Sequence, residues 1–465
     1  MSFGAFIENG PENWQIFQQV DGWARIELSG KYVEFNDTDK NLHVYVRVVN
    51  ESSSDSVVPW MPARMLDGKK WFCEMNVPTG GPYRLESCLK PEDIRIEQAY
   101  RGDMIHHFGV GDLFVIAGQS NSAGYGKDSI YDPPELGIHV LKNNGHWDLA
   151  SHPLNDTTDT VHPINMEGIN PGHSPYLHFA KLLKRELGYP IGLLQASLGG
   201  SNLSQWNPEE DGSLYFNMLE IINAAGGKVK GILWYQGCSD VLLELCDTYL
   251  DRFKAFVQHL RSDLNDSKLP VFTVQLNRFV ADPVPWANTD RGWATIRNAQ
   301  RLATKEIAGV YVVPTLNITL SDNIHNNAAG NLVIGERLAK SVLSHLYGKN
   351  YHADAPDIVD ARAYNETKLV LTFSNVKGSL YAFDLPPEKL PITVEDSKGE
   401  LDIEDYTIVG NKIIIELKRS LEKEAIVHGC HEINPTMTPP IDSEGHLPML
   451  SFSNVRVIFG EKSKA

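Results

Sequence analysis

The sequence is poor in positive charge. Lys and Arg number 42 against 59 Asp and Glu, which gives a formal net charge of -17 over 465 residues. A chain of this charge repels nucleic acid and anionic membrane surfaces, so neither is expected as a partner. A polyanion is for the same reason a poor candidate for the substrate.

Cysteine pairs and long apolar runs are also lacking. The five cysteines are scattered and form no CxxC pair, which argues against a disulfide framework or a zinc knuckle. No segment approaches the roughly 20 apolar residues that a membrane-spanning helix requires. The first residues, MSFGAFIENGPENWQIF, contain no signal-peptide pattern. We therefore expect a soluble cytoplasmic protein, or a secreted or periplasmic one if a leader has been removed.

The chain is about three times as long as a typical domain of roughly 150 residues, so two or three domains are expected. Up to residue 108, apolar and polar residues alternate in short runs such as 42–50 and 70–78. This alternation predicts an N-terminal β-sandwich-like domain over residues 1–108. The alternation returns in 368–376 and in the hairpin 407–417, and it predicts a second such domain over residues 349–465.

Between them, residues 109–348 combine long apolar segments with amphipathic ones, which is typical of βαβ units and a parallel sheet. Strands are expected at 112–118, 191–197, 230–236, 270–276 and 310–315. Helices are expected at 176–188, 247–264, 294–307 and 331–348. The pattern predicts a doubly wound α/β domain.

The connection between the first two of these strands, residues 119–175, is unusually long. Loops of this length in compact domains are usually functional or disordered. Its histidines have no regular spacing, so we expect solvated or substrate-lining side chains and no bound metal. They are His139, His146, His152, His162 and His173.

Ligands of open parallel sheets bind outside the carboxyl ends of the strands. The first strand ends in GQSNSAGYG (118–126), a glycine-bounded turn that presents Ser120. A serine in such a turn can be exposed as a nucleophile, or it can simply cap the following helix. The last strand is followed by Asp322 and His325, spaced so that the carboxylate can orient the imidazole of a base; the same pair can also arise as a helix cap.

Two further strand ends carry possible donors to a developing oxyanion. Gly199 and Gly200 follow the second strand and allow backbone N–H groups to approach a ligand, although two glycines can also form a plain turn. Gln236 ends the third strand, where its amide can donate to the oxyanion or simply line the core. Together the four strand ends indicate a serine hydrolase.

These blocks resemble the SGNH hydrolase superfamily, in the branch of sialate O-acetylesterases and some acetylxylan esterases. The resemblance rests on GQSN (118–121), LGGS with a Trp following (198–206), WYQG (234–237) and DNIH (322–325). It implies a flavodoxin-like sheet and hydrolysis of acetyl esters on carbohydrate without a cofactor. One departure is Cys238, which stands where this branch usually has Glu.

Carried over by position, the resemblance implies Ser120 as nucleophile, His325 as base and Asp322 as its orienting acid. It also implies an oxyanion hole formed by Ser120, Gly200 and Gln236. We expect further contacts to the sugar, although for the tryptophans packing between domains is an equal alternative. These residues are Asn121, Trp206, Trp286 and Trp293.

Two other functions remain open at this point. One is an SGNH lipase or thioesterase, which the absence of an evident amphipathic lid disfavours. The other is a non-catalytic carbohydrate-binding protein. The intact set of Ser120, Asp322 and His325 argues against it, while the replacement of Glu by Cys238 keeps it open. The sequence shows no base next to Cys238, so we do not expect its thiol to act as a second nucleophile.

Overall fold

A parallel sheet forms the middle of the protein in this computed structural model, which describes residues 3–34, 41–168, 171–280 and 289–459. The strands lie in the order β11, β10, β12, β9, β13, β14, β15. All neighbours from β10 to β15 pair in parallel, and β11 is antiparallel to β10. Their bounds are β9 (Tyr100–Gly118), β10 (Ile138–Leu141), β11 (Trp147–Leu149), β12 (Ile191–Gln195), β13 (Gly231–Tyr235), β14 (Val271–Val274) and β15 (Val310–Val313).

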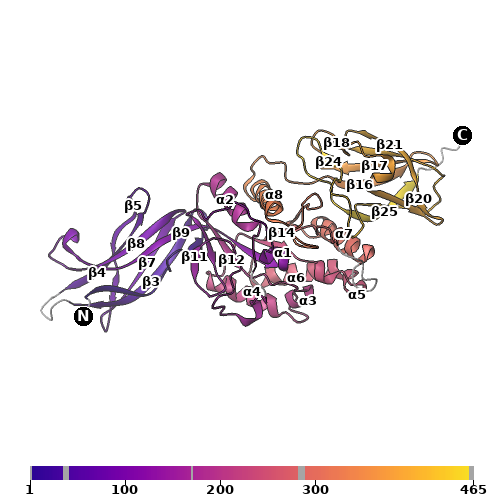
Figure 1. Cartoon of the computed structure of the whole chain (residues 1–465). Coiled ribbons are helices and arrows are strands. Elements are labelled where there is room, and N and C mark those ends of the chain that lie inside the picture. Colours follow the sequence, from indigo (N-terminus) through magenta and orange to yellow (C-terminus); the bar gives the residue numbers. More distant parts are fainter. Residues whose placement is uncertain (1–2, 35–40, 169–170, 281–288, 460–465) are drawn as a thin grey trace.

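Helices cover both faces of this sheet, which explains why its strands are apolar throughout. All five residues of β12 and of β13 are buried. Helices α2 and α8 contact each other on one side, while α4 and α6 lie on the other (Figure 1). Their bounds are α2 (Tyr176–Leu187), α4 (Ser213–Ala224), α6 (Tyr249–Asp263), α7 (Asp290–Glu306) and α8 (Ala328–Tyr347). The five predicted strands and four predicted helices are present. Strands β10 and β11, helix α4 and three four-residue helices, α1 (Ser120–Ala123), α3 (Leu203–Trp206) and α5 (Leu243–Cys246), are additional.

The N-terminal part consists of strands alone. One sheet has the order β1, β3, β7, β6, and its apolar side chains share a core with β4 and β8. The bounds are β1 (Gly4–Asn9), β2 (Ile16–Gln18), β3 (Trp23–Val33), β4 (Leu42–Asn50), β5 (Ser56–Pro62), β6 (Arg64–Leu66), β7 (Lys70–Pro78) and β8 (Gly80–Pro91). Strands β4 and β7 coincide with the predicted segments 42–50 and 70–78.

Strand β9 links this part to the central sheet without a break. Its first half pairs antiparallel with β8, and its second half lies between β12 and β13. The domain boundary predicted at residue 108 therefore falls inside a single strand of 19 residues. The N-terminal strands and the central sheet are thus joined through β9, with no linker between them.

The C-terminal part is again built of strands, in the order β20, β19, β23, β25, β16, β17, β22, β21. The predicted hairpin is formed by β21 and β22, which turn at Gly410 and Asn411. The bounds are β16 (Asp357–Ala363), β17 (Lys368–Ser374), β19 (Ile392–Asp396), β20 (Gly399–Leu401), β21 (Ile403–Val409), β22 (Lys412–Leu417), β23 (Ile426–Gly429) and β25 (Phe452–Phe459), with the separate pair β18 (Leu380–Tyr381) and β24 (Ile441–Asp442).

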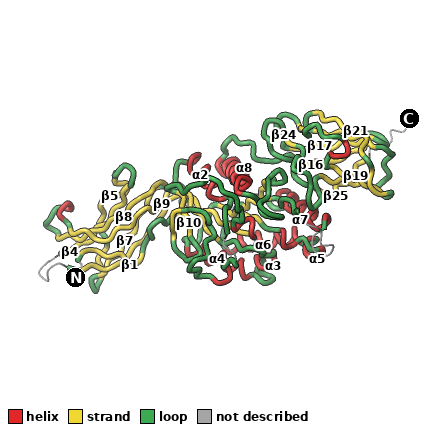
Figure 2. Tube along the Cα trace, in the orientation of Figure 1, coloured by secondary structure: helices red, strands yellow, loops and turns green. Residues whose placement is uncertain are grey.

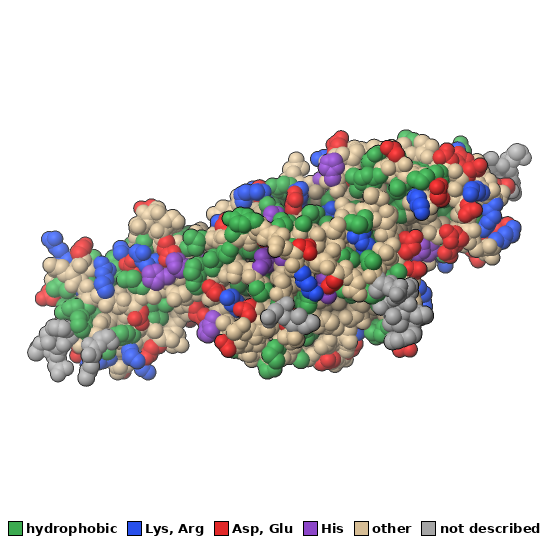
Figure 3. Space-filling view, in the orientation of Figure 1, with side chains coloured by type: hydrophobic (Ala, Val, Ile, Leu, Met, Phe, Trp, Pro, Cys, Tyr) green, Lys and Arg blue, Asp and Glu red, His purple; other side chains and the backbone are tan. Residues whose placement is uncertain are grey.

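The molecule is elongated, and its helices are gathered mostly in the middle third (Figure 2). Acidic and basic side chains are interspersed on the face shown in Figure 3. Within the described residues, no helix is both long and apolar enough to cross a bilayer.

Candidate active site

Ser120 lies directly beyond the carboxyl end of β9, at the start of the short helix α1 (Ser120–Ala123). The turn depends on Gly118, whose φ is +126°; a Cβ at this position would lie 2.3 Å from the carbonyl oxygen of Tyr235. The glycine lets β9 turn sharply against β13. As a result, the Ser120 side chain is placed at the sheet edge rather than within the sheet.

His325 and Asp322 lie on the connection between β15 and α8. The Nε2 atom of His325 is 2.8 Å from the Oγ atom of Ser120, and its Nδ1 atom is 2.7 Å from Oδ2 of Asp322. Burial alone would raise the pKa of Asp322, but hydrogen bonds from the ring and backbone N–H of His325 and from the N–H of Ile324 lower it below its ordinary value. Asp322 is therefore held as a carboxylate facing the imidazole.

Asn121 binds the connection that carries His325. Its Oδ1 atom accepts the N–H of Asn326 at 3.0 Å, and its Nδ2 atom donates to the carbonyl of Ile324 at 3.2 Å. The residue is 5% exposed. The prediction that Asn121 contacts the sugar is corrected: its amide fixes the backbone on both sides of His325.

Two backbone N–H groups at this edge are free to donate. Among the described residues, neither the N–H of Ser120 nor that of Gly200 forms a hydrogen bond. Gly200 has a φ of +71°, and a Cβ placed on it would meet nothing within 4 Å. Gly200 is an exposed residue, and its N–H has no partner among the described residues, so this N–H can serve as a donor to a ligand oxygen.

Gln236 is fully buried, and the structure corrects its predicted place in the oxyanion hole. Its Nε2 atom donates to Oδ2 of Asp240 at 2.5 Å and to the carbonyl of Ser201 at 3.2 Å. Its Oε1 atom accepts the hydroxyl of Tyr249 at 3.0 Å. Both amide hydrogens are thus already donated inside the protein. The residue ties the turn after β12 to the turn after β13.

The predicted tryptophan contacts to a sugar are also corrected. Trp206 is fully buried, donates its indole N–H to Oγ of Ser201 at 3.1 Å and packs edge-on against Trp234. Trp293 is 1% exposed and stacks on Phe279. Both belong to the core of the central part. Trp286 lies outside the described residues.

Cys238 is a half-buried residue whose thiol interacts electrostatically with the guanidinium of Arg297. Burial raises the pKa of Cys238 to about 12, so the thiol stays protonated and is a poor nucleophile. Burial lowers the pKa of Arg297 to about 10. No described carboxylate forms an ion pair with Arg297. Its guanidinium donates instead to the backbone carbonyls of Leu276, Asn277, Glu432 and Ile433.

The histidines of the long connection are not solvated as a group, which corrects that expectation. His139 is fully buried, whereas His152 and His173 both contact Oδ2 of Asp132, at 3.0 and 3.2 Å. Lys181 lies 2.5 Å from the other carboxylate oxygen. Burial alone would raise the pKa of Asp132. The hydrogen bonds from both histidines and from Lys181, together with the charge of the ammonium, hold this pKa far below its ordinary value.

Asp132, His152 and His173 have the donor atoms that a transition metal takes, and their atoms lie within 4.8 Å of one another. Two features of the group are unfavourable for a cation. The ammonium of Lys181 already pairs with the carboxylate, and Nδ1 of His152 faces the N–H of Ser174 at 3.4 Å. A ligating imidazole instead donates from that nitrogen. The cluster is better suited to an ion-pair network.

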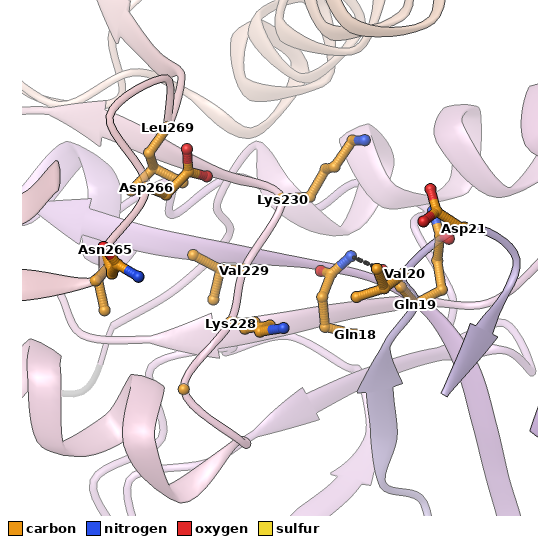
Figure 4. A pocket seen from close by; sticks show the side chains of 12 residues that line it. Gln18, Gln19, Val20, Asp21, Lys228, Val229, Lys230, Asn265, Asp266 and Leu269 are labelled. Atoms are coloured by element: carbon orange, nitrogen blue, oxygen red, sulfur yellow. Dashed lines mark hydrogen bonds between the residues drawn. The ribbon is translucent and has the colours of Figure 1, made fainter. Parts of the chain in front are cut away.

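A cavity of about 470 Å³ lies at the opposite edge of the central sheet (Figure 4). It is lined by Gln18–Asp21, by residues 227–230, which precede β13, and by residues 264–266 and Leu269, which precede β14. Since Ser120 follows the carboxyl end of β9, this cavity is separated from the site by the length of the strands.

Tyr125 and Glu167 also border the site, although no motif in the sequence points to them. The ring of Tyr125 stacks on that of His325 with centroids 4.8 Å apart, and its hydroxyl donates to Glu167 at 2.7 Å. Both residues come from the long connection after α1. An acidic residue in an irregular loop has no local signal of this role; only the contacts across the site reveal it.

Comparison with known proteins agrees with this arrangement. A family model described as "Carbohydrate esterase, sialic acid-specific acetylesterase" matches residues 110–344. A probable carbohydrate esterase of Arabidopsis thaliana is 30% identical over 255 residues, which cover 50% of this chain and 90% of that protein.

The crystal structure of a carbohydrate acetylesterase from Xanthomonas citri has the same fold along nearly the whole chain. The match has a TM-score of 0.67 at 18% identity and covers 96% of this chain and 99% of that one. The family match spans the central sheet with all its strand-end turns, and it confirms the resemblance seen in the sequence motifs. This chain is a carboxylic ester hydrolase and belongs to the carbohydrate esterase family of sialic acid-specific acetylesterases.

Proposed function

We propose that this esterase hydrolyses acetyl esters on carbohydrate, with Ser120 as nucleophile, His325 as general base and Asp322 as the acid that orients the base. The observation that carries the proposal is the hydrogen-bonded chain from Ser120 Oγ to His325 (2.8 Å) and from His325 to Asp322 (2.7 Å). A nucleophile, a base and an orienting carboxylate in this order are the elements of a serine hydrolase.

In the first step the Oγ atom of Ser120 attacks the acetyl carbonyl carbon, and its proton passes to Nε2 of His325. The tetrahedral intermediate then expels the sugar oxygen, which takes the proton from His325 and leaves as a hydroxyl group. The acetyl group remains on Ser120. In the second step a water molecule gives a proton to His325 and attacks the acetyl carbon, and His325 then returns that proton to the Oγ atom of Ser120 as the bond to the acetyl group breaks, which releases acetic acid and free serine.

The negative charge that develops on the carbonyl oxygen is stabilised by the backbone N–H groups of Ser120 and Gly200. Both are undonated among the described residues, and the space beside Gly200 is open. Fixed N–H donors are effective because they need no reorientation as the charge develops. With Gln236 engaged elsewhere, the proposed oxyanion hole is formed by backbone groups.

The architecture that we propose is a flavodoxin-like catalytic domain over residues 109–348 between two β-sandwich-like domains, 1–108 and 349–465. The strand order β12, β9, β13, β14, β15 supports the flavodoxin-like description. Separate apolar clusters for the N-terminal, central and C-terminal parts support the threefold division.

We propose an O-acetylated sugar as substrate, with O-acetyl sialic acid ahead of acetylated xylan. The family description supports sialic acid. Lys127 also supports it, because its side chain is 63% exposed and its ammonium lies 3.7 Å from Asp322, at the rim of the site. An ammonium in this position suits the carboxylate of a sialic acid, which xylan lacks.

The test compares wild type with Ser120→Ala on p-nitrophenyl acetate, and then measures acetate release from O-acetyl sialic acid and acetylated xylan. Ser120→Ala should lower kcat by roughly 10³-fold or more, because the nucleophile is lost. Longer acyl esters provide the comparison for a lipase, and they should be poor substrates. Undiminished turnover in Ser120→Ala would refute the mechanism, and preference for long acyl chains would refute the substrate.

A further inference from the structure

Glu167 is a buried carboxylate that three separate segments bind beside the site. Its side chain accepts the hydroxyl of Tyr125 at 2.7 Å, the N–H of Gly199 at 2.7 Å and the amide of Asn155 at 3.0 Å. The residue is 8% exposed. Charged groups are rarely buried to this extent unless they are well hydrogen-bonded, so the position of Glu167 is closely specified.

Two of its partners reach the proposed catalytic groups directly. Tyr125 lies face to face with His325, with an angle of 24° between the ring planes. Gly199 immediately precedes Gly200, whose N–H is a proposed oxyanion donor. A Cβ on Gly199 would lie 2.7 Å from Oε2 of Glu167 and 3.0 Å from the hydroxyl oxygen of Tyr125, so this pair packs against the glycine turn itself.

We propose that Glu167 and Tyr125 act together as positioning residues: they fix the His325 ring relative to the Gly200 turn, and the Glu167 carboxylate stabilises the imidazolium that forms as Ser120 attacks. This inference rests on the proposed serine esterase mechanism. Neither residue needs to touch the substrate. Their effect passes through the histidine ring on one side and the glycine turn on the other.

The electrostatic part follows from the charges around His325. Its protonated form would face the carboxylates of Asp322 and Glu167, the former directly and the latter through Tyr125. Lys127 opposes them from beside Asp322. Burial and the Glu167 carboxylate raise the pKa of Tyr125, so its phenol remains neutral and its π face is available to an imidazolium.

Burial raises the pKa of Glu167 above its ordinary value, although its hydrogen bonds and the charge of His325 act in the opposite direction. The carboxylate and a protonated His325 therefore stabilise each other. Because proton transfer from Ser120 creates the imidazolium, a carboxylate at this place stabilises the transition state more than the ground state. A residue that only filled space would not have this property.

The first test is Glu167→Gln, which keeps the size of the side chain and removes its charge. We expect kcat on p-nitrophenyl acetate to fall about tenfold with KM nearly unchanged, because the imidazolium formed in the transition state loses one nearby opposite charge. A wild-type kcat, or a fall in kcat/KM that arises from KM alone, would overturn the proposal.

Tyr125→Phe and Tyr125→Leu separate the hydroxyl from the ring and decide the question if Glu167→Gln does not fold. The Phe variant should keep part of the activity lost in the Leu variant, because it retains the stack on His325. Tyr215→Phe is the matched control: this tyrosine donates to Asp263 at 2.6 Å, away from the site, and its loss should leave kcat unchanged. Equal activity of Tyr125→Leu and wild type would overturn the role of the ring.

These outcomes are distinct from failure of the proposed function. If wild type does not hydrolyse acetyl esters, or if Ser120→Ala is as active as wild type, the mechanism itself is refuted and the inference with it. If wild type is active and Ser120→Ala is not, the Glu167 and Tyr125 variants test the inference alone.

Discussion

Both oxygens of the Asp322 carboxylate are bound by the segment that carries His325. One oxygen accepts the N–H groups of Ile324 and His325 at 2.9 and 2.8 Å, and the other lies 2.7 Å from Nδ1 of His325. The carboxylate therefore fixes both the backbone conformation and the ring of the histidine.

Asp322→Asn should lower kcat by roughly 10²–10⁴-fold with a much smaller change in KM, because an amide N–H facing Nδ1 favours the tautomer that cannot accept the serine proton. Steady-state kinetics on p-nitrophenyl acetate measure this, and circular dichroism checks the fold. Activity within about threefold of wild type would show that the carboxylate does not orient the base.

Gln236→Leu should affect stability more than chemistry. The substitution removes the buried hydrogen bonds of the Gln236 amide to Asp240, Ser201 and Tyr249, and we expect a loss of about 2–4 kcal/mol in the free energy of unfolding. Urea unfolding measures it, with Gln275→Leu as the matched control, since Gln275 is another fully buried amide that donates to two carbonyls. A variant of normal stability whose kcat falls by roughly 10²-fold would instead restore an oxyanion role for Gln236.

Cys238→Glu should place a carboxylate near the buried guanidinium of Arg297. At neutral pH we expect this variant to be more stable than Cys238→Gln by about 1–3 kcal/mol, because only the charged side chain offsets the buried positive charge. The difference should shrink in acid as the glutamate is protonated. Equal stabilities of the two variants at neutral pH would indicate that Arg297 needs no charged partner.

His139 should make the folded state less stable in mild acid. Burial lowers its pKa from 6.5 to about 4, and its Nε2 atom has no partner among the described residues. Between these values the unfolded chain binds a proton that the folded chain does not, so stability falls as pH decreases, by up to about 1.4 kcal/mol per pH unit.

The variant His139→Asn should reduce this slope, because asparagine does not titrate and its amide can donate to the carbonyl of Trp14 as Nδ1 of His139 does. Thermal unfolding of both proteins from pH 7 to pH 4 makes the comparison. Parallel stability curves would exclude His139 as a source of the acid sensitivity.

The central sheet and the meeting of Ser120 with His325 could be predicted from sequence because both follow from local patterns. Apolar runs of the right length predict strands, and the carboxyl ends of parallel strands share one edge. The short strands β10 and β11 were not predicted, because a segment of three or four residues has too little periodicity to be recognised. They lie in the same long connection as Glu167.

Side-chain direction could not be predicted in this way. Trp206 lies close in sequence to the glycine turn, yet its indole points into the core and bonds Ser201. Gln236 lies at the expected strand end, but its amide points toward Asp240. In both cases the position along the chain is right, and packing with segments distant in sequence decides which way the side chain faces.

The continuity of β9 also constrains how the protein can fold. Successive side chains of a strand point to opposite faces of the sheet. A shift of one residue in the pairing of β9 with β12 or β13 would therefore exchange the two faces of β9. The peptide before Ser120 would then point in the opposite direction. The antiparallel ladder with β8 fixes the same strand at its other end. The pairing of β8 with β9 thus helps to fix the register of β9 in the central sheet, and a chain cut within β9 should lose the correct alignment along with the strand.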